Sequence, residues 1–134
     1  MEMNTYHFKR KEILIVDDDE FSIFLCETLF REHFNITGVT SGHEALKVIE
    51  ERKFDAVLMD INLGDGSLDG IRTTRLIRQN KKHRGLKIVA ITAFSKDKGF
   101  YTSQGFDDLF VKPLLEENLI GVMNEALEKR SLTY

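Results

Sequence analysis

Hydrophobic and polar positions alternate along the chain in a pattern that predicts five strands, each followed by a helix. Short apolar runs indicate the strands, and apolar residues spaced three or four positions apart indicate the helices. The strands are expected at residues 12–16, 35–39, 54–59, 87–91 and 108–111. Such regular alternation is typical of an α/β domain with a parallel sheet.

The stretches between the strands carry the signals of amphipathic helices. In the first of these helices, the apolar stripe is predicted to consist of Phe21, Leu25, Thr28 and Leu29. Ser41 and Glu44 have the spacing of a capping box, which predicts that a helix begins there. A further helix is expected at about 69–80, whereas the fourth helix is the weakest because Gly99 interrupts a short stretch.

Acidic residues directly follow two of the predicted strands. Residues 13–16 run into Asp17 and Asp18, and residues 56–59 run into Asp60. Because the carboxyl ends of parallel strands meet at one edge of a sheet, we expect these acids to converge where ligands of open α/β sheets bind. Thr92 follows the fourth strand and Lys112 follows the fifth. The sequence therefore predicts a metal and phosphoryl site at this edge.

Length and charge limit the classes of protein that fit. The chain has 134 residues, which predicts a single globular domain over 12–130 with a lead-in at 1–11 and a tail at 131–134. Its net charge of −3 does not favour a nucleic-acid partner. No apolar stretch approaches membrane-spanning length, and the N-terminus lacks the apolar region of a secretory signal. A cytoplasmic protein without a membrane contact is expected.

Five short motifs together carry a family resemblance. They are Val16-Asp17-Asp18, Met59-Asp60, Asp69-Gly70, Thr92-Ala93 and Lys112-Pro113. With these motifs the chain resembles the receiver domain of two-component response regulators over nearly its full length. The resemblance implies a flavodoxin-like (βα)5 fold, in which a doubly wound, five-stranded parallel sheet has the strand order 2-1-3-4-5.

The resemblance also implies a phosphorylation cycle. Asp60 would accept a phosphoryl group from a sensor histidine kinase or a histidine phosphotransfer protein. Mg²⁺ would be bound directly by Asp18 and Asp60, through water by Asp17, and by the backbone carbonyl of Asn62. Thr92 and Lys112 would contact the phosphoryl group, and the Lys112–Pro113 bond would be cis. The domain would then signal through altered contacts with a downstream protein, including a phosphorylation-dependent homodimer, and would turn over no external substrate.

Some positions depart from the usual pattern of the family. Leu109 occupies the position of the aromatic switch residue, three before Lys112. Gly64 stands where a proline is common, so we expect a looser loop after Asp60. Phe94 is predicted to slow hydrolysis of the aspartyl phosphate.

Two alternatives to a phosphoacceptor remain. One is a pseudo-receiver, an interaction module that does not use phosphorylation. The other is a flavodoxin-like nucleotide-binding domain, which the absence of a glycine-rich phosphate loop after the first strand disfavours.

Overall fold

The structure, a computed structural model, describes residues 10–64, 68–93 and 98–112, together with residues 120, 121, 123, 124 and 127. The predictions for Phe94 and for the Lys112–Pro113 bond fall on residues outside these ranges, as do most of the lead-in and the tail.

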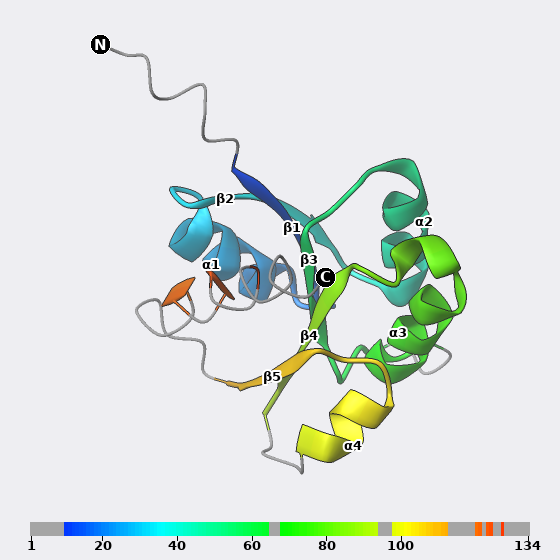
Figure 1. Cartoon of the computed structure of the whole chain (residues 1–134). Coiled ribbons are helices and arrows are strands. Elements are labelled where there is room, and N and C mark those ends of the chain that lie inside the picture. Colours follow the sequence, from blue (N-terminus) through cyan, green and yellow to red (C-terminus); the bar gives the residue numbers. More distant parts are fainter. Residues whose placement is uncertain are drawn as a thin grey trace.

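Five parallel strands form one sheet in the order β2-β1-β3-β4-β5, which confirms the predicted topology (Figure 1). The strands are β1 (Lys11–Val16), β2 (Phe34–Val39), β3 (Ala56–Asp60), β4 (Lys87–Thr92) and β5 (Asp108–Val111). Their ends differ from the predicted ends by at most two residues. β1 and β3 are neighbours, and their register pairs Val16 with Met59. The first acid after β1 and the last residue of β3 therefore lie side by side.

Helices cover both faces of the sheet. They are α1 (Glu20–Phe30), α2 (Gly42–Glu51), α3 (Gly70–Gln79) and α4 (Lys98–Ser103), with a short 3-10 helix, η2 (Lys81–His83), after α3. Figure 1 shows α1 on one face and α2 and α3 on the other. No helix within the described part of the chain has both the length and the apolar character needed to cross a bilayer.

Side chains that accept backbone N–H groups determine where the helices begin. The N-cap residues of α1, α2 and α3 are Asp19, Ser41 and Asp69. The predicted start of α2 at Ser41 is confirmed, because Ser41 Oγ accepts from Glu44 N at 3.1 Å, which satisfies a donor that the first helical turn leaves without a partner. Glu44 Oε1 accepts from Thr40 N at 2.8 Å, one residue before the N-cap.

Alternate residues of each central strand point into two separate hydrophobic cores. In β1, Leu14 and Val16 face the core beneath α2 and α3, while Ile13 and Ile15 face the core beneath α1. β3 is buried at every position, as predicted for a strand covered on both faces. The central strands are thereby fixed, and their carboxyl ends provide a rigid edge for a site.

The predicted apolar stripe of α1 is wrong as a core-facing stripe. The face that packs against the sheet contains Ile23, Cys26 and Phe30, whereas Phe21 and Leu25 are 64% and 45% exposed. This helix carries apolar residues around most of its circumference, so two stripes satisfy the same helical period. The period alone could not decide which of them faces the sheet.

Arg78 joins the end of α3 to two loops at the amino edge of the sheet. Its guanidinium donates to the carbonyl oxygens of His83 (3.0 Å), Leu86 (2.7 Å) and Gly105 (2.8 Å), and to the Asp107 carboxylate (2.8 Å). Gly105 has φ +110°, a conformation that favours glycine. The planar guanidinium thus donates to three backbone carbonyl groups and pairs with one carboxylate from a single position.

Replacing Arg78 by alanine should lower the free energy of unfolding by about 2–3 kcal/mol, because several partly buried acceptors lose a charged donor. Urea denaturation measures this change. Arg75→Ala is the matched control, since Arg75 is an exposed arginine of the same helix. Equal effects of the two substitutions would contradict the assigned role of Arg78.

Candidate functional site

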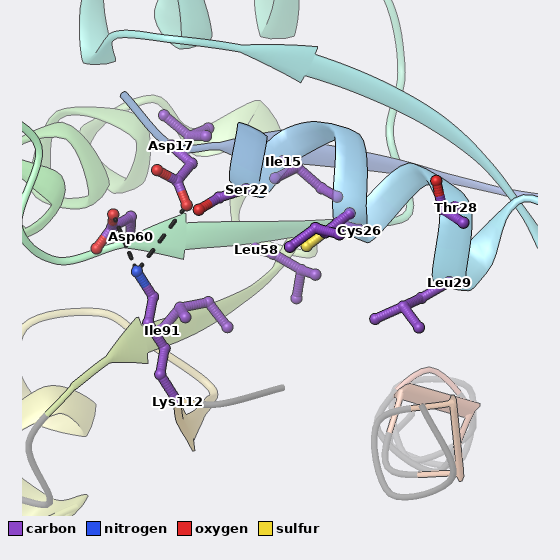
Figure 2. Close-up of a pocket in the computed structure, with 12 residues that line it drawn as sticks. Ile15, Asp17, Ser22, Cys26, Thr28, Leu29, Leu58, Asp60, Ile91 and Lys112 are labelled. Carbon is purple, nitrogen blue, oxygen red and sulfur yellow. Dashed lines mark ion pairs between the residues drawn. The ribbon is translucent and has the colours of Figure 1, made fainter. Parts of the chain in front are cut away.

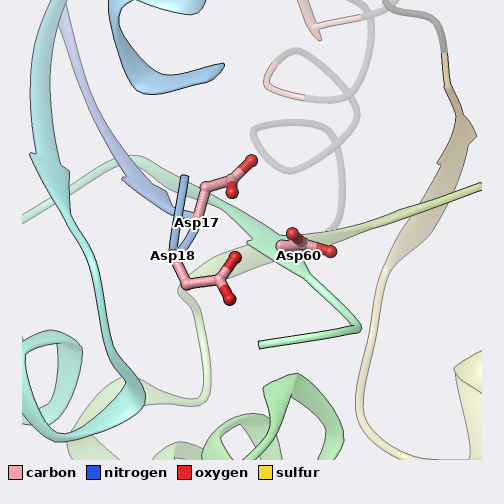
Figure 3. Close-up of side chains that lie close together, drawn as sticks. All are labelled: Asp17, Asp18 and Asp60. Atoms are coloured by element: carbon pink, nitrogen blue, oxygen red, sulfur yellow. The ribbon is translucent and has the colours of Figure 1, made fainter. Parts of the chain in front are cut away.

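Three carboxylates lie together at the carboxyl edge of the sheet. Asp17 and Asp18 directly follow β1, and Asp60 is the last residue of β3. Each of the three side chains contributes one carboxylate oxygen to a group in which all three oxygens lie within 4.8 Å of one another. Figure 3 shows the three side chains grouped around one small space. The structure thus brings together the three acids that the sequence predicted to converge.

Each of these carboxylates accepts a hydrogen bond from a backbone N–H. Asp17 Oδ1 accepts from Asp19 N at 2.9 Å, and Asp60 Oδ1 accepts from Asn62 N at 3.0 Å. Asp18 Oδ2 accepts from Gly64 N, at 2.7 Å. Backbone donors of this kind stabilise the charged form of a carboxylate and fix its orientation.

Lys112 brings a positive charge to the acidic cluster from the end of β5. Its Nζ lies 3.6 Å from Asp60 Oδ2 and 4.0 Å from Asp17 Oδ2, as the dashed lines in Figure 2 mark. The backbone N–H of Lys112 donates to the carbonyl of Thr92 at 2.8 Å. Thr92 ends β4 and is 2% exposed. The Lys112 ammonium group thus lies beside the acids, as predicted.

Burial changes the electrostatics of the cluster. Asp17 and Asp60 are only 6% and 5% exposed, whereas Asp18 faces solvent. Burial raises the pKa of Asp17 to about 6, and the Asp19 N–H opposes this rise. The negative charge of Asp60 raises the pKa further, and Lys112 lowers it.

The donor set fits a hard divalent cation. Carboxylate oxygens are the ligands that Mg²⁺ prefers, and it is usually held by one or two of them together with water or phosphate. One lysine does not balance three carboxylates, so a cation would remove repulsion that the chain's own charges leave. Asn62, predicted to contribute its carbonyl, lies two residues beyond Asp60 on the exposed loop at the same edge. Its role as a ligand stays a prediction.

A pocket of about 620 Å³ adjoins the acidic cluster on the α1 side of the sheet. Its apolar wall includes Ile15, Leu58 and Ile91 from the sheet, and Asp17, Asp60 and Lys112 also line it (Figure 2). From α1 it is lined by Ser22, Leu25, Cys26, Thr28 and Leu29. Leu25, Thr28 and Leu29 of the predicted apolar stripe therefore face this pocket.

Cys26 also lines the pocket but is poorly suited to act as a nucleophile. Burial raises the pKa of its thiol to about 11, and the negative charge of Asp17 adds to the rise. Since the thiolate is the reactive form, Cys26 stays a neutral, buried side chain.

Two further residues beside the acidic cluster, Asp19 and Gly64, form hydrogen bonds that shape it. Asp19 caps α1, accepting from Phe21 N at 3.0 Å. The prediction of a looser loop missed the role of Gly64, whose N–H is bonded to Asp18. No motif signals this contact, because its two residues are 46 positions apart.

Comparison with known proteins shows the family of the chain. Residues 13–124 match the response regulator receiver domain. The chain is 32% identical over 125 residues to the sensor histidine kinase GacS of Pseudomonas protegens, covering 89% of this chain and 13% of that protein. It is 32% identical over 118 residues to the transcription factor SKN7 of Candida albicans, covering 86% of this chain and 20% of that protein. The chain therefore belongs to the response regulator receiver domain family, and it spans well under two thirds of these relatives.

Solved structures show the same fold. A putative response regulator from Chloroflexus aurantiacus matches with a TM-score of 0.82 and 28% identity, covering 90% of this chain and 99% of that one. The receiver domain of sensor histidine kinase PA1611 from Pseudomonas aeruginosa matches with a TM-score of 0.79 and 29% identity, again covering 90% and 99%. That structure holds a magnesium ion coordinated in its active site cleft.

The raised pKa of Asp17 predicts how the stability of the metal-free protein depends on pH. The folded state binds the proton of the Asp17 carboxyl group more tightly than the unfolded chain does. The stability that this proton adds to the folded state is therefore fully present below about pH 4 and is lost as the pH rises through about 6. In EDTA, the free energy of unfolding of Asp17→Asn should therefore rise relative to that of the wild type as the pH increases from about 4 to above 6, by at most about 3 kcal/mol. Urea denaturation at several pH values measures the difference, and a constant difference would contradict the prediction.

Proposed function

We propose that this receiver domain accepts a phosphoryl group on Asp60 from a phosphohistidine of a sensor histidine kinase or histidine phosphotransfer protein. The observation that supports this most is the convergence of Asp17, Asp18 and Asp60 oxygens within 4.8 Å, with Lys112 Nζ 3.6 Å from Asp60. Of the three acids, Asp60 ends the central strand β3 and contacts the lysine most closely. It is therefore the acid that we assign as the acceptor.

The transfer is a substitution at phosphorus. A carboxylate oxygen of Asp60 forms a bond to the phosphorus atom while the bond between phosphorus and the donor's imidazole nitrogen breaks. The imidazole leaves with the electron pair of that bond, and Asp60 becomes an aspartyl phosphate. Asp60 Oδ1 is held by the Asn62 N–H, so the carboxylate is oriented before the donor arrives.

Asp17, Asp18 and Asp60 are the residues that would hold Mg²⁺, with the carbonyl of Asn62 as a further ligand. When bound, the cation supplies positive charge that neutralises the carboxylates and the phosphoryl oxygens. This assignment rests on the oxygen donors of the triad and on the excess of negative charge at the site.

Lys112 and Thr92 provide the remaining groups. The ammonium of Lys112 pairs with a carboxylate now and can pair with a phosphoryl oxygen after transfer, because a flexible stem carries a compact charge. Thr92 can donate its hydroxyl hydrogen to another phosphoryl oxygen. Its place at the end of β4, linked to Lys112 through the backbone, puts it at the same edge.

A pseudo-receiver that does not use phosphorylation is not favoured. Such a module needs the fold alone, whereas here two neighbouring acids are buried, with repulsion and desolvation that the fold does not require. Lys112 offsets only part of this repulsion. We infer that the domain is a signalling phosphoacceptor, with a downstream protein or a second copy as its output partner and without an external substrate.

Incubation with acetyl phosphate and Mg²⁺ should add the mass of one phosphoryl group to the intact protein, and Asp60→Asn should abolish the gain. Asp69→Asn is the control, because Asp69 caps α3 outside the triad and asparagine caps helices equally well. A mass gain that persists in Asp60→Asn would overturn the assignment of the acceptor. The absence of any gain in the wild type would favour the pseudo-receiver.

Replacing Lys112 by alanine should slow this phosphorylation by about tenfold or more, because a charge positioned beside the reacting carboxylate is lost. The rate of mass gain measures the effect. Lys98→Ala is the matched control, since Lys98 also pairs with a carboxylate, that of Asp108 at 3.2 Å, but away from the triad. Similar rates in the two variants would refute the role of Lys112.

A further inference from the structure

Gly64 approaches the carboxylate of Asp18 more closely than a residue with a side chain could. Its N–H donates to Asp18 Oδ2 at 2.7 Å, and a Cβ atom built on Gly64 would lie 2.5 Å from the same oxygen. Among the described residues, the only glycine with positive φ is Gly105. The conformation at position 64 therefore does not require glycine, but at the observed contact a Cβ atom would force the Asp18 carboxylate or the loop to shift.

Asp18 depends on this contact more than the other two acids depend on theirs. Asp17 and Asp60 are buried, and each accepts an N–H from the residue two positions further along its own turn. Asp18 faces solvent, and its backbone donor comes from a loop 46 residues away. The position of its carboxylate is thus set by a long-range contact with the loop between β3 and α3.

We propose that Gly64 is a positioning residue for the cation site, because its N–H and its lack of a side chain hold the Asp18 carboxylate within the acidic triad. One oxygen of Asp18 is held by the loop, which leaves the other for a divalent cation. A side chain at position 64 displaces either the carboxylate or the loop, and both changes separate Asp18 from its partners. This inference rests on the proposed function, since it assumes that the triad binds Mg²⁺.

Isothermal titration with Mg²⁺ tests the proposal on the full chain. Gly64→Ala should weaken binding by about tenfold or more, the usual effect of losing a group that orients a metal ligand. Gly121→Ala is the matched control, because a Cβ atom there meets nothing within 4 Å. We expect its affinity to equal that of the wild type. Equal affinities of Gly64→Ala and the wild type would overturn the proposal.

A double-substitution cycle separates positioning from a general effect on the loop. In an Asp18→Ala background, exchanging Gly64 for alanine should no longer change the Mg²⁺ affinity, because the group that Gly64 positions is absent. A loss as large as in the wild-type background would show that Gly64 acts by another route and would overturn the proposal.

A measurement on the unsubstituted loop covers the case in which Gly64→Ala fails to fold. In amide NMR spectra, Asp18→Asn should shift the Gly64 N–H resonance strongly and the Asn62 N–H resonance little, since Asn62 donates to Asp60. An unmoved Gly64 resonance would overturn the proposal. Failure of the proposed function gives a different result, namely that the wild type itself neither binds Mg²⁺ nor gains a phosphoryl group.

Discussion

The chemistry of the site is governed by the repulsion among three carboxylates that the sheet brings together. Asp17 and Asp60 lie at the ends of adjacent central strands and are only 6% and 5% exposed. Such groups can retain charge only with nearby donors and cations. The chain itself supplies two sources of compensation, backbone N–H groups and the ammonium of Lys112. The proposed divalent cation would be a third, and it alone could be exchanged. This is why a change in what occupies the site alters the forces on its surroundings.

The two hydrophobic cores make this crowding possible. Because alternate side chains of β1 are buried in opposite directions, neither β1 nor β3 can shift without opening a core. The strand ends therefore resist the repulsion of the acids that follow them. The hydrogen bonds of Arg78 act at the opposite edge, where they fasten α3 to the loops before β4 and β5.

The sequence predicted the sheet, the triad and Lys112 because each follows from local pattern. Short apolar runs identify strands, and parallel topology brings their ends together, so Asp17 and Asp60 could be placed without coordinates. The buried face of α1 could not be predicted in this way, because Ile23 and Leu25 belong to two different apolar stripes that both have the helical period. The contacts of Gly64 and Arg78 also escaped prediction. Both join residues distant in sequence, and their donors are backbone or side-chain N–H groups whose aim is set by packing alone.

The residues of the site differ in how deeply the strands that carry them are buried. Asp17 and Asp60 follow central strands, whereas Lys112 follows β5, a strand of four residues at the edge of the sheet with no fully buried position. In the proposed function, a phosphoryl group on Asp60 would bring its charge beside Lys112, whose N–H donates to the carbonyl of Thr92. Two exposed apolar residues lie near this edge of the sheet, Val111 on β5 and Phe100 on the short α4 that precedes β5. Since Leu109 is aliphatic, rotation of an aromatic ring at position 109 cannot carry a signal outward.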